Sequence, residues 1–240
     1  MKFKTVAVPI MLGVILMTNL AHSAIRPTVT RVIALESDKE TAIKLVNDDK
    51  DHEYLVQSWI EDQRGNDKNI PLILTPPLFK MGAGREGKLR MVILPGKIAQ
   101  DRESVYWLWI QEIPPTSKSK ENQLQIAVRT RLKVFIRPTT LTEKSADTLN
   151  KLAWSVTREG GKTWLVAKNP TQYYANFSTL SVTVRGNALP LSDKNVMVPA
   201  KSESKYALPA GAAGQTGVVN YSLINDFGGE SPLQHRSLTF

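Results

Sequence analysis

The sequence predicts an all-β protein with two β-sandwich domains joined by a short hinge. Short apolar segments recur about every ten residues with turn residues between them, which is typical of sandwich strands. Several segments alternate apolar and polar side chains, the two-residue period of a half-buried strand. No segment of helical length shows the 3.6-residue apolar period of an amphipathic helix. The 240 residues fit two domains of roughly 100 residues each.

The first residues have the order of a secretory signal peptide. Two lysines precede a mostly apolar run over 5–20, and small residues follow it. This run is shorter than the ~20 residues that a membrane-spanning helix needs. We therefore expect residues 1–24 to be a signal peptide, with cleavage after either Ser23 or Ala24. The product is expected to be exported, with no stable membrane insertion.

The first domain is expected over residues 25–140. Its predicted strands cover 29–35, 41–46, 54–61, 88–94, 104–112 and 124–136. Leu89, Met91 and Ile93 show the alternation clearly. Pro138 ends the last strand, because proline lacks the N–H group that a sheet ladder needs, and polar residues follow it. A hinge is therefore expected directly after this proline.

The second domain is expected over residues 141–240, where a new series of strand-like segments begins. Its predicted strands cover 152–157, 163–168, 177–184, 217–223 and 236–240. We expect Tyr173 and Tyr174 to pack in the core of this domain.

Composition narrows the class of function. The formal charge of +9 would suit anionic partners, but the basic residues are spread along the chain and export makes nucleic acid an unsuitable partner. The chain contains no cysteine, so disulfides, thiol chemistry and cysteine-bound metals are excluded. Its three histidines are isolated. We expect no cofactor, no metal site and no enzymatic activity, because the sequence shows no cluster of a nucleophile, a base or metal ligands.

Residues 122–138, NQLQIAVRTRLKVFIRP, carry the most informative pattern. Leu124, Ile126 and Val128 alternate with other residues, so their side chains should lie on one face of a strand. The strand then becomes basic, with Arg129, Arg131, Lys133 and Arg137. Such a strand could belong to an ordinary core. It could equally offer a partner a hydrophobic row and an anion site, and alternation alone favours the first interpretation.

Six further segments occur in a fixed order around this strand. They are YLVQSWIE at 54–61, TPPLF at 75–79, DRES at 101–104, EIPP at 112–115, NPT with two tyrosines at 169–174, and INDFGG at 224–229. Together they resemble the PapD-like family of periplasmic pilus chaperones, and the resemblance extends over about 30–229. Trp109 departs from the family pattern, which typically has asparagine there.

The resemblance implies two immunoglobulin-like domains in a boomerang shape. It also implies a periplasmic chaperone that binds pilin (fimbrial) subunits. Such a chaperone lends its G1 strand to complete the subunit, which is donor strand complementation, and passes the subunit to an outer-membrane usher. The short connection after 112–115 and the lack of cysteine resemble the branch with a short F1–G1 loop.

The resemblance also assigns roles to individual residues. The residues that would enter the pilin groove are Leu124, Ile126 and Val128. The pair that would hold the C-terminal carboxylate of the pilin is Arg31 and Lys133. The interdomain charge cluster would be Glu103, Arg137 and Asp226. In a regular strand Lys133 faces the opposite side from the apolar row, so we expect a twist, a bulge or the nearby hinge to place it in the cleft.

One alternative function and one question of assembly remain open at this stage. The chain could be an exported structural or adhesive subunit of a surface fibre. In either case its apolar row could be covered by a second copy of the chain, giving a self-capped homodimer.

Overall fold

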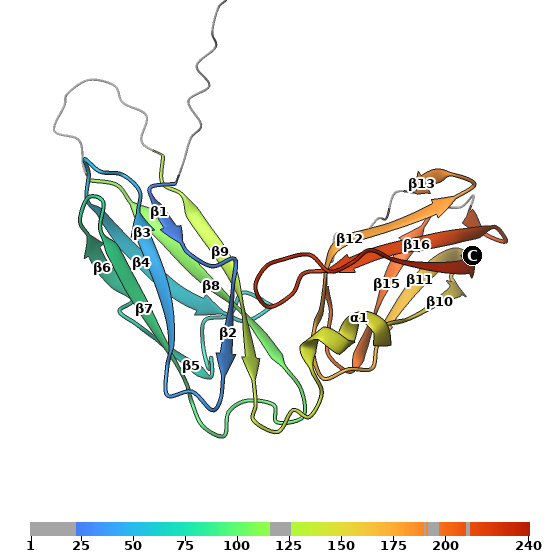
Figure 1. The fold of residues 1–240 in the computed structure, drawn as a ribbon, viewed down its shortest axis with the longest axis horizontal. Coiled ribbons are helices and arrows are strands. Elements are labelled where there is room, and N and C mark those ends of the chain that lie inside the picture. Colours follow the sequence, from blue (N-terminus) through green and yellow to red (C-terminus); the bar gives the residue numbers. More distant parts are fainter. Residues whose placement is uncertain (1–22, 116–125, 190, 192–196, 210–211) are drawn as a thin grey trace, which may run out of the picture.

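The structure, a computed structural model, describes residues 23–115, 126–189, 191, 197–209 and 212–240. It contains two β-sandwich lobes that meet at an angle, so that the molecule is bent like a boomerang (Figure 1). The predicted all-β fold with two immunoglobulin-like domains is therefore confirmed. None of the helices within the described ranges is long and apolar enough to cross a membrane.

The first lobe consists of two sheets. The strand order of one sheet is β1 (Ile25–Pro27), β3 (Thr41–Asn47), β7 (Glu86–Ile93) and β5 (Leu72–Thr75). The order of the other is β2 (Arg31–Leu35), β9 (Arg129–Arg137), β8 (Ser104–Ile113), β4 (Tyr54–Glu61) and β6 (Leu78–Met81). Alternate residues of both sheets point inward, and Leu45, Leu89 and Leu108 are among the fully buried ones.

The second lobe begins after a short helical segment. This segment comprises η1 (Ser145–Asp147) and α1 (Thr148–Lys151). One sheet has the order β10 (Ala153–Glu159), β11 (Lys162–Asn169) and β15 (Ser202–Leu208). The other has β13 (Asn187–Leu189), β12 (Ala175–Val184), β16 (Thr216–Leu223) and β17 (Gln234–Thr239), with β14 (Met197–Val198) beside β12. Tyr206 and Tyr221 are fully buried between these sheets.

The strand predicted at 29–35 is observed as β2, and a separate strand that was not predicted, β1, precedes it with different neighbours. β1 pairs antiparallel with β3, whereas β2 pairs parallel with β9 in the opposite sheet. The chain crosses between the sheets directly after Pro27, which cannot donate a backbone hydrogen bond and therefore suits a strand end. This switch brings Arg31 beside the last strand of the lobe.

The strand predicted at 124–136 begins later than expected. β9 starts at Arg129, and Ile126 and Val128 precede it without belonging to a strand. Leu124 lies outside the described residues. The hydrogen bonding to β8 nevertheless extends to Val128, whose carbonyl oxygen accepts a 3.1 Å hydrogen bond from the backbone N–H of Glu112.

No bulge is present at Lys133. β8 and β9 pair in regular register from Ser104 opposite Ile136 to Gln111 opposite Arg129. The side chains of Leu132 and Val134 are buried in the core, so Lys133 between them points outward. It reaches the cleft because the cleft lies on the outer face of this sheet.

Candidate binding cleft between the lobes

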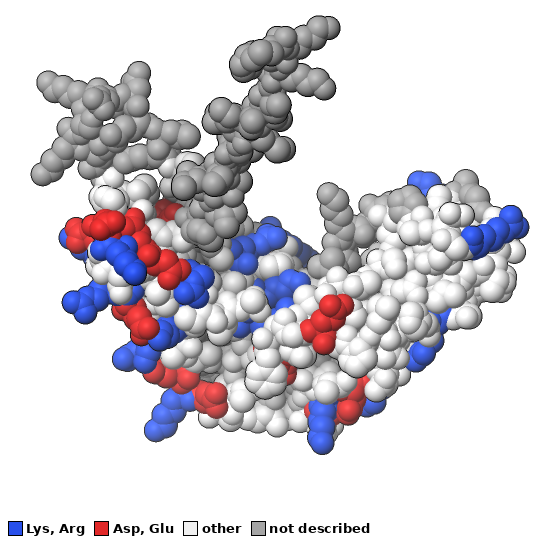
Figure 2. Space-filling view, turned by 45° about the horizontal axis from the view of Figure 1, so that its top comes forward, with Lys and Arg blue, Asp and Glu red and all other residues white. Residues whose placement is uncertain are grey.

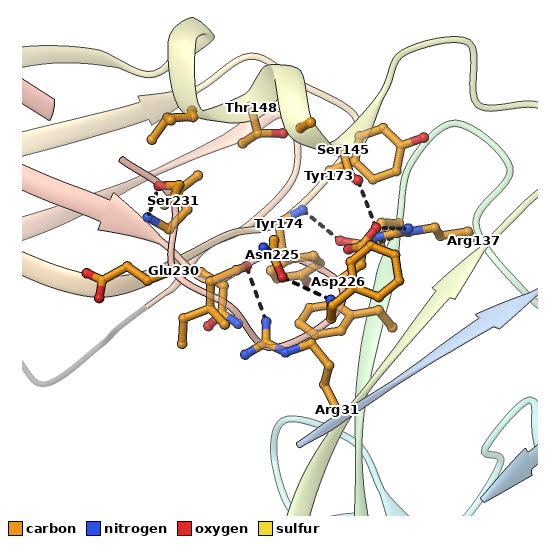
Figure 3. A pocket seen from close by; sticks show the side chains of 18 of the residues that line it. Arg31, Arg137, Ser145, Thr148, Tyr173, Tyr174, Asn225, Asp226, Glu230 and Ser231 are labelled. Atoms are coloured by element: carbon orange, nitrogen blue, oxygen red, sulfur yellow. Dashed lines mark hydrogen bonds and ion pairs between the residues drawn. The ribbon is translucent and has the colours of Figure 1, made fainter. Parts of the chain in front are cut away.

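Two cations lie side by side at the start of the β2–β9 pairing. Arg31 and Lys133 are direct partners in the parallel register. Lys133 Nζ donates a 2.5 Å hydrogen bond to Oδ1 of Asn176, on β12 of the second lobe. One terminal N–H group of Arg31 donates a 3.3 Å bond to the carbonyl oxygen of Ile224. Both cations therefore face the second lobe, as the close view shows for Arg31 (Figure 3).

The charges of this pair are poorly compensated. Burial, together with the charges of the neighbouring Arg31 and Arg131, lowers the pKa of Lys133 to about 8. Burial also lowers the pKa of Arg31, and its buried Nε has no hydrogen-bond partner. Within the described residues neither cation forms an ion pair. Such a pair favours an incoming anion, and a carboxylate could accept hydrogen bonds from both groups.

Arg31 borders a pocket of about 480 Å³ between the lobes, and Lys133 is bonded to Asn176 in its wall. Arg31 and Phe135 line it from the first lobe, and Asn176, Ile224 and Pro232 line it from the second. Figure 3 shows the side chains of both lobes converging on this space. A chain end that entered it would contact both lobes.

The predicted charge cluster is brought together at the floor of the bend. Arg137 Nε lies 2.7 Å from a carboxylate oxygen of Glu103, and its two terminal nitrogens lie 2.7 and 2.6 Å from the two oxygens of Asp226. Glu103 is only 3% exposed. Burial alone would lower the pKa of Arg137, but hydrogen bonds and charges from Asp226 and Glu103 raise it. Arg137 is therefore bound to both lobes and is not available to a ligand.

Tyr173 and Tyr174 belong to the junction and not to the core of the second lobe, so that expectation was wrong. Tyr173 lies against the guanidinium group of Arg137, 5.0 Å from it. The ring of Tyr174 packs on Phe135 with centroids 6.1 Å apart, and its backbone N–H donates to Glu103. Sequence pattern could not distinguish these positions, because aromatic side chains are buried at interfaces as well as in cores.

The two described residues of the apolar row, Ile126 and Val128, directly precede the far end of β9. Ile126 is 63% exposed, and Val128 is partly buried. β2 pairs only with 133–137 of β9, so residues 129–132 have no strand beside them on that edge within the part of the chain that is described. An extended chain could add there, in line with β2.

Sequence reasoning missed two contributors to the cleft. Asn176 fixes the ammonium group of Lys133, and the ring of Trp107 lies 5.8 Å from the same group. Trp107 is opposite Lys133 in the β8–β9 register. Tryptophans alternate along β8 and cations alternate along β9 in the sequence. Their contact can be recognised only when the register between the two strands is known.

The fold and the cleft together define a two-domain, immunoglobulin-like binding protein with a cationic cleft and an open strand edge. Residues 24–142 match the family described as pili and flagellar-assembly chaperone, PapD N-terminal domain. Residues 147–235 match the PapD C-terminal domain of pili assembly chaperones. The chain belongs to the PapD-like family of pilus assembly chaperones.

Individual relatives agree with this assignment. Chaperone protein LpfB of Salmonella typhimurium is 42% identical over 201 residues, which cover 83% of this chain and 82% of the relative. Chaperone protein FimC of Escherichia coli K12 is 34% identical over 215 residues, which cover 88% and 83%. Both comparisons extend over most of the two chains.

Two solved structures are similar in fold. The Escherichia coli chaperone DraB matches with a TM-score of 0.72 and 29% identity, covering 90% of this chain and 99% of that one. A structure of the Salmonella enterica SafA pilin in complex with the SafB chaperone matches with a TM-score of 0.74 and 27% identity, covering 91% and 98%.

Proposed function

We propose that this chaperone acts in the periplasm after removal of residues 1–24, where it binds pilin subunits and passes them to an outer-membrane usher without an enzymatic step. The observation that carries the proposal is the position of Arg31 and Lys133. The pairing of β2 with β9 begins at these two residues. The unpaired edge of β9 therefore ends at two cations. The SafA–SafB complex is a precedent for a pilin held by a similar chaperone.

The geometry suggests how a subunit is held. A strand added to β9 in line with β2 would run parallel to β9 and would end at Arg31. Its C-terminal carboxylate would then meet the cation pair, which fixes the register of every residue before it. Backbone hydrogen bonds along the edge would add affinity with little selectivity.

The apolar row would supply further binding energy. We propose that Leu124, Ile126 and Val128 enter the open groove of the subunit. Burial of three such side chains stabilises a complex by about 1.5–3 kcal/mol each, before the cost of ordering the two chains is subtracted. When no subunit is present, we propose that a second copy of the chain covers this row. Sedimentation of the isolated protein measures whether this homodimer forms.

Replacement of Arg31 tests the proposal. The Arg31→Ala variant should recover at least about tenfold less co-expressed pilin from a periplasmic extract than the unmodified protein, because a buried carboxylate loses its charged partner. Circular dichroism should show an unchanged fold, since Arg31 forms no ion pair within the described residues.

Arg90→Ala is the matched control. Arg90 is an exposed arginine of β7, on the other sheet of the first lobe. Its replacement should leave recovery unchanged. Equal recovery by Arg31→Ala and the unmodified protein would contradict the role of the cation pair.

A further inference from the structure

A layer of arginine and tryptophan side chains covers the outer face of the β4–β8–β9 sheet. Arg131 lies 4.1 Å from the ring centre of Trp107 and 5.1 Å from that of Trp109. Arg129 lies 5.6 Å from Trp109 and 5.2 Å from Trp59. We call these five residues the arginine–tryptophan face. Two of its tryptophans come from β8, one from β4, and both arginines from β9.

The aromatic part of the arginine–tryptophan face is held rigidly. The rings of Trp59 and Trp109 are stacked with centroids 6.0 Å apart and planes 15° apart. Their indole N–H groups donate to the two carboxylate oxygens of Glu61 at 2.8 and 2.6 Å. Both oxygens of Glu61 are therefore engaged by the indoles. The guanidinium groups rest on a fixed platform, which leaves the N–H groups of Arg131, and those of Arg129 that do not bond to Gln111, available to a ligand.

No carboxylate of the described residues pairs directly with the arginines of the face; Glu61 is bonded to the tryptophans instead. Arg129 donates two hydrogen bonds to the neutral side chain of Gln111, at 3.2 and 2.9 Å. Neither Arg129 nor Arg131 forms an ion pair with any described residue, and both are exposed. In Figure 2, Lys and Arg atoms gather in the hollow between the lobes.

This face continues directly from the cation pair. Arg129, Arg131 and Lys133 alternate on one side of β9, so they are spaced by roughly 7 Å along the strand. They follow the open edge on which a strand would add. Side chains on the cleft side of that added strand would lie next to Arg131 and Arg129, at two alternate positions before its end.

We propose that the arginine–tryptophan face selects pilin subunits whose last strand carries carboxylate side chains at two alternate positions facing the cleft. This rests on the proposed function, because it needs the subunit's C terminus at Arg31 and Lys133. A planar guanidinium group offers a two-pronged donor that a carboxylate accepts better than a neutral amide. Subunits with neutral or basic residues there would leave two arginines unpaired beneath the added strand.

Synthetic ten-residue peptides with alternating apolar residues and a free C terminus test the selection on the whole mature chain. One series carries two Glu or two Gln residues two and four positions before the last residue. The other carries them one and three positions before it. In only one of the two series, the Glu peptide should bind more tightly than the Gln peptide. The expected difference, measured by calorimetry, is about two- to fivefold for each carboxylate. That series identifies the register.

Variants connect the preference to the face. Arg129→Gln combined with Arg131→Gln should abolish the preference for Glu, whereas Arg90→Gln, with a loss of charge on the other sheet, should retain it. Trp107→Leu, which keeps both arginines but removes the support of Arg131, should weaken the preference. Increasing salt should reduce it as well.

The outcomes separate this inference from the proposed function. Equal affinities for Glu and Gln peptides in both series, or a preference that survives in the double variant, would overturn the inference while subunit binding stands. Binding that is insensitive to amidation of the peptide C terminus, or no binding of any free-acid peptide, would overturn the proposed function, and the selection with it.

Discussion

Lys133 is a partly buried lysine placed between the guanidinium groups of Arg31 and Arg131. Burial, followed by the charges of these two neighbours, lowers its pKa from 10.5 to about 8. The protonated form is thus less favourable in the folded protein than in the unfolded chain. Between about pH 8 and 10.5 the unfolded chain binds more protons, so the stability of the free protein should rise with pH across this window.

Subunit binding should show the opposite dependence on pH. A bound carboxylate favours the protonated form of Lys133, so affinity for a free-acid peptide should fall as pH rises through about 8. Calorimetry at pH 8 in buffers of different ionisation enthalpy should show proton uptake. An amidated peptide should show neither effect.

Lys133→Met should raise the urea midpoint of the free protein at pH 7, because it removes an uncompensated charge. A lower midpoint would contradict this account.

At the scale of elements, the start of β9 is held by a buried carboxylate. Glu112 on β8 is 4% exposed, and it accepts hydrogen bonds from the backbone N–H groups of Ile25 at 2.8 Å and Val128 at 3.3 Å. In the unprocessed chain it also accepts one from the hydroxyl of Ser23. One side chain thus joins the first strand of the lobe to the segment that leads into β9.

Glu112→Gln should destabilise the first lobe. The amide offers one acceptor oxygen where the carboxylate has two, so a buried N–H loses its partner, at a cost of about 1–3 kcal/mol. Urea unfolding measures the loss, and hydrogen exchange at Val128 should accelerate. Glu53→Gln, which changes an exposed carboxylate, is the control and should change stability little. Equal effects of the two substitutions would argue against this role for Glu112.

The sequence predicts most of the strands that alternate over a long stretch, but not the short ones. β5 and β6 have four residues each and β13 has three, too few for a period of two to be recognised. The site, too, could be predicted only in part from the sequence. The resemblance places Arg31 and Lys133, but the stacking of Arg131 on Trp107 depends on cross-strand register, which no local pattern contains.

At the scale of the whole molecule, one loop of the second lobe contacts the first lobe through two arginines. Ile224 accepts a hydrogen bond from Arg31, and Asp226 pairs with Arg137. Burial would raise the pKa of Asp226, but the hydrogen bond and charge of Arg137 lower it. This loop, which follows β16, therefore helps to set the angle between the lobes.

Asp226→Ala should loosen that angle without unfolding either lobe. Arg137 keeps Glu103 as its partner, so the buried carboxylate stays compensated. Small-angle scattering should show a larger radius of gyration and a broader distance distribution, with a thermal midpoint close to that of the unmodified protein. Asp101→Ala, which breaks an exposed pair with Lys201, is the matched control and should leave the scattering unchanged. Identical scattering of Asp226→Ala and the unmodified protein would show that this ion pair does not set the angle.

The parallel pairing of β2 with β9 also has a consequence for the order of folding. It joins segments roughly a hundred residues apart in sequence, and contacts of that separation form late because a long loop must close first. The first lobe cannot complete this sheet until β9 has been delivered. In a chain that is exported, as proposed, and that crosses the membrane unfolded with its N terminus first, the residues that precede β9 cross before this sheet can close. The cation pair then comes into being only once the chain has arrived in the compartment where its ligand is found.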